Sequence, residues 1–531
     1  MSVPDPVLSI QNLTITLPLS GDRREAVKDL SLDVARGEIV CIVGESGSGK
    51  SVTAFTIMNL LARGLVVQTG KMLYGGRDLL ALNVRDRREL SGKSIAMVFQ
   101  EPMSALNPVL TIGWQIEEVL KIHERTLSAS QRRSKVLKIL DAVHLPDSKL
   151  IARAYPSQIS GGQRQRVMIA MALILKPDIL IADEPTTALD VTTQAQILRL
   201  LDELRRETGM GVLFVTHDIG VVRDIADRVI VMRGGRVVEA GTASEVLDNP
   251  KEDYSRLLIN SIPSDIPPEV KRTSSDDVLL TIRGLDKHYR RGVFSVHETK
   301  AVCGVNLTIR RGEVVSIVGE SGSGKSTLAR MIAGLVPSSA GTVEFNRSLE
   351  NVRRGPYRQV QMVFQDPNRS LNPRILIGSS LMEGPINMGV SRAEALTRVE
   401  ALIDRVGLDR RALRRYPHQF SGGQRQRICI ARALAMSPSL LIADEAVSAL
   451  DVTVQKQVLD LLAELREELE LSILFITHDL RVAAQISDRI CVMQRGRIVE
   501  EGRATQIFSQ PSSEYTRQLL DALPGRLKAF N

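Results

Sequence analysis

The sequence is poor in aromatic residues and in cysteine. Only 3% of its 531 residues are aromatic, and Trp114 is the single tryptophan. Cores built instead from Val, Ile, Leu and Ala are typical of α/β domains. The four cysteines, Cys41, Cys303, Cys429 and Cys491, lie far apart and form no CxxC pair. This spacing excludes a disulfide framework and a cysteine-rich metal centre, and it predicts small buried hydrophobic side chains.

Long apolar runs are also missing. The longest candidate, residues 167–184, is interrupted by Lys176, Pro177 and Asp178, whereas a membrane span needs roughly 18 apolar residues. The first residues lack the basic start and apolar core of a secretory signal peptide. We therefore expect a cytoplasmic protein, either soluble or peripheral to a membrane. The net charge of +8 suits an anionic partner, but an ordinary solvated surface explains it equally well.

The chain is rich in internal repetition. The stretch VGESGSGKS at Val43–Ser51 recurs at Val318–Ser326, an offset of 275 (318 − 43). SGGQRQR, LIADE and THD each recur at an offset of 261 (421 − 160 for the first), and VFQ recurs at 265 (363 − 98). A repeat of this length is a whole domain rather than a solenoid unit. We predict a first domain at 1–262, a linker rich in Pro, Ser and charge at 263–277, and a second domain at 278–531.

The first repeated motif has the pattern G-x-x-x-x-G-K-S. An apolar β-rich run precedes it and a helix-capable run follows it in both copies, which is the context of a phosphate-binding loop. Lys50 and Lys325 are predicted to reach the β- and γ-phosphates, and Ser51 and Ser326 to ligate Mg²⁺. The predicted nucleotide-binding residues are Gly44, Glu45, Ser46, Gly47, Ser48, Gly49, Lys50, Ser51 and Val52, with Gly319, Glu320, Ser321, Gly322, Ser323, Gly324, Lys325, Ser326 and Thr327.

The second repeated motif is an apolar strand that ends in two acids. Asp183 and Asp444 are predicted to complete the Mg²⁺ site through water, and Glu184 and Glu445 stand one residue later, where a carboxylate could polarise the attacking water. Acids often terminate strands, so the motif alone is weak evidence. Its position after a phosphate loop in both halves favours the functional interpretation.

A histidine follows a third β-rich run in each copy. His217 and His478 could each reach a γ-phosphate. The other five histidines, which include His123, His144 and His297, have no repeat partner. We interpret those five as ordinary surface or core residues.

The order of motifs is specific. A phosphate loop, VFQ, SGGQ, an acid-ended strand, ALD and a strand-terminal histidine occur in this order twice, and in this the chain resembles the ATP-binding cassette (ABC) ATPases over nearly its whole length. The resemblance implies an α/β fold of two tandem P-loop ATPase domains, each with a mostly parallel core sheet, an antiparallel β-subdomain and a helical subdomain. It also implies ATP and Mg²⁺ as cofactors and ATP hydrolysis as the reaction.

The resemblance assigns further roles. Gln100 and Gln365 would sense the γ-phosphate and ligate Mg²⁺. A signature loop opens a helix and would contact the γ-phosphate across a head-to-tail interface between the two cassettes. The signature residues are Ser160, Gly161, Gly162 and Gln163, with Ser421, Gly422, Gly423 and Gln424. Lys50 would then share its ATP with Ser421, and Lys325 with Ser160.

That pairing explains why one chain carries two cassettes. Each phosphate loop makes only half a site, so fusion supplies the obligate dimer, and the short linker raises the effective concentration of the two halves. The ALD loops, which end at Asp190 and Asp451, match the family loop that crosses the interface.

Two departures distinguish the halves. Tyr289 stands where family members stack an aromatic ring on adenine, and its first-half counterpart is Leu17. Pro185 after the first acid pair is replaced by Ala446 after the second. Both catalytic acids remain, so we predict two competent sites.

Three features favour the branch that imports peptides and nickel. The LNP segments after each glutamine, the Tyr-Pro before each signature and the tails at 249–263 and 510–525 resemble that branch. The resemblance implies two integral membrane permease subunits, an extracytoplasmic solute-binding protein, no nucleic acid, and a peripheral place on the cytoplasmic face of the inner membrane. Leu106, Val109, Leu110 and Leu371 are predicted permease contacts. Neither tail has a cysteine, so we expect no iron–sulfur cluster.

Other classes stay open. A tandem-cassette translation factor would bind the ribosome, but such proteins usually carry a long charged helical linker and lack the LNP and tail segments. DNA-repair ATPases carry zinc-binding cysteines or coiled-coil insertions, and sugar-importer ATPases would lack the tail. The sequence leaves the transported substrate open among peptides, opines, glutathione and nickel.

Overall fold

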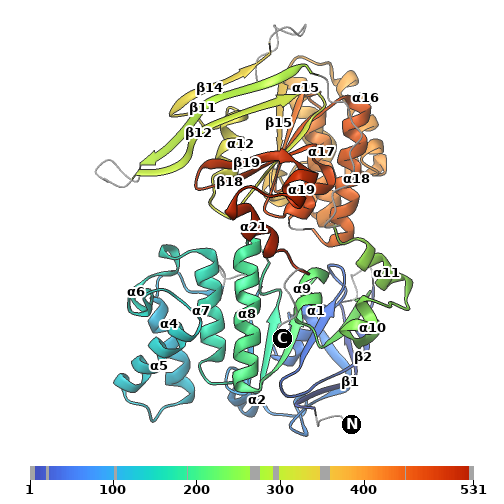
Figure 1. Cartoon of the computed structure of the whole chain (residues 1–531). Helices are drawn as coiled ribbons and strands as arrows, with labels where there is room; N and C mark the ends of the chain where they lie inside the picture. Colours follow the sequence, from blue (N-terminus) through green and yellow to red (C-terminus); the bar gives the residue numbers. More distant parts are fainter. Residues whose placement is uncertain are drawn as a thin grey trace. The chain divides into compact units, whose positions relative to one another are not determined.

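The computed structural model describes residues 6–18, 23–100, 105–187, 189–263, 276–290, 298–346, 359–448 and 450–525. The chain divides into two compact units, whose main bodies are Met1–Leu189 with Thr193–Ile262, and Pro263–Leu523. Figure 1 shows the elements of each. Most of the predicted linker, at 264–275, lies outside the described residues. Within the described ranges, no helix has the length and apolar character that a membrane span requires.

The first unit contains a six-stranded sheet. Its strands are β3 (Ile39–Val43), β6 (Ile95–Val98), β7 (Ile179–Asp183), β8 (Gly211–Val215), β9 (Arg228–Arg233) and β10 (Arg236–Thr242). Their order is β10-β9-β3-β8-β7-β6, with parallel pairing except at the edge strand β10. All residues of β3, β7 and β8 are buried. Parallel strands covered on both faces need such unbroken apolar runs.

An antiparallel sheet packs beside it through a shared core. Its strands are β1 (Leu8–Thr16), β2 (Glu25–Val34), β4 (Val66–Tyr74) and β5 (Arg77–Asp78). Buried Leu8, Met72, Ile42 and Ile57 belong to one apolar cluster that joins the two sheets and the helix after the phosphate loop. The accompanying helices are α1 (Lys50–Ile57), α2 (Val84–Leu90), α8 (Val191–Thr208), α9 (Ile219–Ile225), α10 (Ala243–Leu247) and α11 (Asp253–Asn260).

The helical subdomain lies between β6 and β7 in the sequence. It consists of α4 (Ile112–His123), α5 (Ala129–Ala142), α6 (Ser148–Arg153), the 3₁₀ turn η1 (Pro156–Gln158) and α7 (Gly161–Leu173). Ile112, Ile116 and Leu120 of α4 are fully buried at the four-residue spacing of one helix face. This packing supports the start of α7, where the predicted signature loop lies.

The second unit repeats this plan. Its six-stranded sheet has the order β15-β16-β17-β13-β18-β19, and its antiparallel sheet the order β12-β11-β14. The strands are β11 (Val278–Arg290), β12 (Glu298–Arg310), β13 (Val314–Val318), β14 (Ala340–Phe345), β15 (Val360–Val363), β16 (Leu440–Asp444), β17 (Ser472–Thr477), β18 (Arg489–Gln494) and β19 (Arg497–Arg503). The helices are α12 (Lys325–Ile332), α14 (Pro367–Ser370), α15 (Ile377–Asn387), α16 (Arg392–Arg405), η2 (Arg410–Arg414), η3 (Pro417–Gln419), α17 (Gly422–Leu434), α18 (Val452–Leu469), α19 (Leu480–Ile486), α20 (Ala504–Ser509) and α21 (Glu514–Asp521). The predicted fold class is confirmed.

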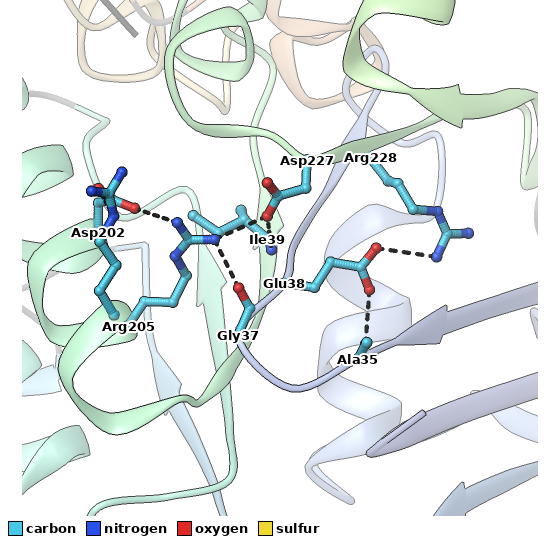
Figure 2. A network of polar contacts seen from close by, with 9 residues as sticks. Ala35, Gly37, Glu38, Ile39, Asp202, Arg205, Asp227 and Arg228 are labelled. Carbon is cyan, nitrogen blue, oxygen red and sulfur yellow. Dashed lines mark hydrogen bonds and ion pairs between the residues drawn. The ribbon is translucent and has the colours of Figure 1, made fainter. Parts of the chain in front are cut away.

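A polar network closes the amino end of the core sheet (Figure 2). In the first unit, Arg205 donates hydrogen bonds to the Gly37 carbonyl at 2.8 Å and to Asp227 at 3.0 Å. Asp227 also accepts the backbone N–H of Ile39, at 2.7 Å. A carboxylate thus holds the first peptide of β3, at the end opposite the phosphate loop.

The second unit contains the same network. Arg466 donates to the Gly312 carbonyl at 2.8 Å and to Asp488 at 2.5 Å, and Asp488 accepts the N–H of Val314 at 2.8 Å. Arg205 and Arg466 share the 261-residue offset (466 − 205). The repeat therefore preserves the support of the sheet as well as the site motifs.

We expect Arg466→Ala to lower the free energy of unfolding of the second unit by about 3–5 kcal/mol, because a mostly buried carboxylate loses its cation. The Arg466 side chain is 7% exposed. Arg411→Ala is the matched control, since the Arg411–Asp409 pair has 90% and 65% exposed side chains and should contribute less than about 1 kcal/mol. Urea unfolding followed by circular dichroism measures both. Equal stability of the two variants would contradict this prediction.

Two groups of expectations need correction. Cys41, Cys429 and Cys491 are buried as predicted, but Cys303 is only half-buried. Leu106 and Leu371, predicted to contact a permease, are 3% and 2% exposed. Their side chains pack inward, because an apolar residue in a loop can serve the core as readily as a partner.

Candidate functional site

Each phosphate loop follows the central strand of its sheet and is shaped by glycine. Gly44, Gly47 and Gly49 have φ values of 148°, 76° and 106°, a region that L-residues with a side chain rarely adopt. A Cβ at Gly44 would lie 2.1 Å from the Met232 carbonyl oxygen. The second loop is nearly identical, with φ 154° at Gly319. These glycines let the backbone turn tightly enough to surround a phosphate.

The loop lysines are buried inside their own loops. The Lys50 ammonium donates to the carbonyls of Gly44 at 2.7 Å and Glu45 at 2.9 Å. Lys325 makes the same bonds to Gly319 and Glu320, at 2.7 and 2.8 Å. Burial lowers the pKa of Lys325. A phosphate would stabilise the charged ammonium, so these residues fit a nucleoside triphosphate.

The serine next to each lysine meets the strand-end aspartate. The Ser51 hydroxyl donates to Asp183 at 2.9 Å, and the Ser326 hydroxyl donates to Asp444 at 2.8 Å. Burial raises the pKa of Asp183 to about 6 and also raises the pKa of Asp444. A divalent cation would favour the ionised carboxylates, and a hydroxyl with a carboxylate is an oxygen donor set that suits Mg²⁺. Among the described residues, no group of three or more His, Cys, Asp or Glu could hold a metal ion by itself.

The strand-end glutamates gather the other predicted catalytic groups. In the first unit, Oε2 of Glu184 accepts hydrogen bonds from Gln100 Nε2 at 2.8 Å and from the Thr187 hydroxyl at 3.0 Å. The other carboxylate oxygen of Glu184, Oε1, lies 3.2 Å from His217 Nδ1. Burial alone would raise the pKa of Glu184, but the hydrogen bond and charge of His217, with Lys50, hold that pKa below its ordinary value. The carboxylate is therefore ionised and able to accept a proton from water.

The second unit forms the same cluster more loosely. Gln365 Nε2 donates to Glu445 at 2.7 Å, but His478 Nδ1 lies 3.9 Å from Glu445. Ser448 occupies the position of Thr187 and donates to the Glu445 backbone carbonyl instead of its side chain. Glu184 and Glu445 both adopt positive φ, at 45° and 48°, a strained conformation that non-glycine residues keep where function requires it.

The signature residues open α7 and α17. Ser160 and Ser421 are the N-caps, and each closes a capping box with Gln163 or Gln424. The backbone N–H groups of a helix start attract anions. The second glycine of each signature is required by close helix packing. A Cβ at Gly162 would lie 2.5 Å from Thr193 of α8, and a Cβ at Gly423 would lie 2.3 Å from Val454 of α18. Ala188 and Ala449 of the ALD loops lie outside the described residues.

The predicted adenine-stacking residue lies on the antiparallel sheet. Tyr289 is 43% exposed, and the Lys287 ammonium lies 5.1 Å from its ring centroid. Leu17 occupies the equivalent position in the first half. The Leu17 N–H donates to the Arg24 carbonyl, and Tyr289 pairs with Thr299, which is the repeat counterpart of Arg24 at the offset of 275 (299 − 24). The first half therefore lacks an aromatic ring at this point.

Sequence profiles decide what these motifs belong to. The profile described as "ABC transporter" matches residues 27–187 and 302–448. The chain belongs to the ABC transporter family. Members of this family bind and hydrolyse ATP, and this ABC protein is such an ATPase. A second profile, "Oligopeptide/dipeptide transporter, C-terminal region", matches residues 238–276 and 499–528, which places the ABC chain in the branch that its tails predicted.

Curated relatives agree. The glutathione import ATP-binding protein GsiA of Salmonella choleraesuis is 44% identical and covers 98% of this ABC chain, which covers 89% of that protein. GsiA of Escherichia coli gives the same values, and GsiA of Pectobacterium atrosepticum is 43% identical with the same coverage. These relatives support the transporter interpretation over the ribosome-binding alternative. A solved dimeric bacterial ABC transporter cassette is 34% identical over 44% of this chain and 98% of its own, with a TM-score of 0.40.

Sequence reasoning missed one group of residues near the phosphate loops. The tail tyrosines, Tyr254 and Tyr515, have hydroxyls within hydrogen-bond distance of the loops. Their common offset of 261 (515 − 254) is a signal of a shared role, whereas the resemblance of the tails to one branch of the family says nothing of a contact with the loops.

Proposed function

We propose that this chain is the energy-coupling subunit of a binding-protein-dependent importer for peptides or related small solutes. The observation that carries the proposal is the oligopeptide/dipeptide C-terminal region, which matches twice, once at the end of each cassette. The named function of the GsiA relatives, glutathione import, supports a short peptide-like solute.

Two complete sets of site residues support two ATP sites. Mg²⁺ would be held by Ser51, Asp183 and Gln100 in the first, and by their counterparts Ser326, Asp444 and Gln365 in the second. When bound, Mg²⁺ would neutralise charge on the β- and γ-phosphates. The lysines would bind the phosphates, and Glu184 and Glu445 would accept the proton of the attacking water. Following the family resemblance, we propose that the signature loop of each cassette completes the site of the other.

The chain would act with partners. We propose two integral membrane permease subunits and an extracytoplasmic solute-binding protein, with this chain peripheral on the cytoplasmic face of the inner membrane. Val109, in the segment after Gln100, is 74% exposed. It remains a candidate for permease contact, whereas the inward-facing Leu106 does not.

A pull-down tests the proposal. The tagged full chain is recovered from membranes in mild detergent, and its partners are identified by mass spectrometry. We expect two multi-spanning proteins, and we expect Val109→Asp to reduce their recovery, because a carboxylate at an apolar contact loses its hydration. Val84→Asp, at a residue 62% exposed on α2, is the matched control. Recovery of ribosomal proteins without membrane partners would overturn the proposal in favour of a translation factor.

A further inference from the structure

The tail helix of each half contacts the phosphate loop of the same half. Tyr254 of α11 is 5% exposed, and its hydroxyl accepts the backbone N–H of Glu45 at 3.2 Å. Tyr515 of α21 is 7% exposed, and its hydroxyl accepts the N–H of Glu320 at 3.1 Å. The same bond thus occurs twice, between segments more than 190 residues apart in the sequence.

The bond acts on one particular peptide group. The carbonyl of the Gly44–Glu45 peptide accepts the Lys50 ammonium, while the N–H of that peptide donates to Tyr254. Each end of the peptide therefore has a partner. The lysine ammonium has three N–H groups to share between the loop carbonyls and a bound phosphate. The tyrosine hydroxyl holds the N–H end of the peptide while those bonds are redistributed.

The tail helix is itself fixed to the core sheet. Glu239 of β10 accepts the backbone N–H groups of Lys251 at 2.8 Å and Glu252 at 3.3 Å, just before α11. In the second half, Glu500 of β19 accepts the N–H groups of Ser512 and Ser513, at 2.7 and 3.0 Å, before α21. A carboxylate at a helix start is stabilised by the helix dipole, so each tyrosine projects from an anchored support.

A purely packing role does not account for the hydroxyl. Leu258 and Leu519 already bury the apolar faces of the two tail helices, and phenylalanine would fill the tyrosine sites equally well. Burial raises the pKa of Tyr515 to about 12, which keeps its hydroxyl neutral at ordinary pH. Both halves retain the hydroxyl although their tails differ at other positions, such as Leu257 and its counterpart Gln518.

We propose that Tyr254 and Tyr515 are positioning residues for ATP binding: each hydroxyl holds the first peptide of its phosphate loop while the loop lysine moves to the nucleotide. This inference rests on the proposed ATP sites. It gives the branch-specific tail a direct part in the affinity for ATP, so any partner that displaces the tail would weaken that affinity.

Tyr254→Phe, Tyr515→Phe and the double variant of the full chain test the inference, by steady-state ATPase kinetics and equilibrium ATP binding. We expect the double variant to raise the KM for ATP about two- to tenfold, the range for one net hydrogen bond per site, with kcat within about twofold. KM changes because the loop must be ordered by the nucleotide itself. The tyrosine hydroxyls contact the loop backbone rather than the reacting phosphate, so we expect kcat to remain close to that of the unmodified protein.

Tyr74→Phe is the matched control. Its hydroxyl donates to Asp178 at 2.5 Å, away from the loop, so its loss should leave KM unchanged. An unchanged KM in the double tyrosine variant, or an equal rise in Tyr74→Phe, would overturn the inference. Lys50→Ala with Lys325→Ala separates the two claims. If that variant keeps its ATP affinity, the proposed sites fail; if it loses affinity while the phenylalanine variants do not, only the inference fails.

Discussion

Replacing both strand-end glutamates, Glu184→Gln with Glu445→Gln, is expected to lower kcat for ATP hydrolysis by about 10²- to 10⁴-fold while ATP still binds. This is the usual contribution of a positioned general base. Glutamine keeps the shape of the side chain and can still pair with Gln100 and Gln365, but its amide cannot take a proton from water. The electrostatic part of the site, made by the loop lysines, stays intact.

The environment of Glu184 gives the prediction its physical basis. The pKa of Glu184 lies below its ordinary value, chiefly because the hydrogen bond and charge of His217 outweigh burial. Stability or activity that depends on this ionised carboxylate is therefore present above the ordinary pKa of glutamate and is lost only as the pH falls through the lowered value. We expect hydrolysis at neutral pH to be insensitive to the titration of this group.

The single variants Glu184→Gln and Glu445→Gln test whether both sites hydrolyse ATP. Each is expected to reduce the rate of phosphate release, measured at saturating ATP, because each cassette has its own glutamate, glutamine and histidine. Glu89→Gln and Glu468→Gln are matched controls, since these side chains are 70% and 56% exposed and remote from the site motifs. If one single variant keeps the full rate, that site is silent and the prediction of two competent sites is wrong.

Much of the fold could be predicted because its signals are local. The strands β3 and β8 are apolar throughout, β7 is apolar up to its final Asp183, and a repeated motif stands at the end of each. The tight turns of the predicted phosphate loops could be expected from their glycines, since a positive φ and a close carbonyl require glycine at Gly44 and Gly49. Repetition strengthened each of these arguments, because chance does not produce a motif twice at one offset.

The missed features depend on contacts between distant segments. The bond between Tyr254 and Glu45, and the support of β3 by Arg205 and Asp227, join residues that are ordinary in their local sequence. The inward orientation of Leu106 could not be predicted from the sequence either, because apolar residues in loops pack into cores as well as into interfaces. The offset of 261 could have found Arg466 as the partner of Arg205, but an offset alone does not say what a residue touches.

Removing the loop lysines is the second large effect that we expect. Lys50→Ala should lower the number of ATP molecules bound per chain from two to one at a concentration that saturates the unmodified protein, and Lys50→Ala with Lys325→Ala should lower it to none. Loss of a buried charged partner costs about 2–5 kcal/mol, which corresponds to roughly 30-fold or more in affinity. Isothermal titration in the presence of Mg²⁺ measures both the number of sites and their affinity.

The stoichiometry is informative because each lysine lies within its own half. Lys149→Ala and Lys456→Ala are exposed controls in the first and second units and should leave two sites. Thermal unfolding of each variant tests whether a lost site reflects a destabilised fold, because alanine leaves two loop carbonyls without the ammonium as donor. If Lys50→Ala retained two sites of equal affinity, the Gly44–Ser51 loop would not be the phosphate-binding element. If instead Lys50→Ala abolished both sites together, the expected fall from two sites to one would be wrong, and the cassettes would bind ATP only as a pair.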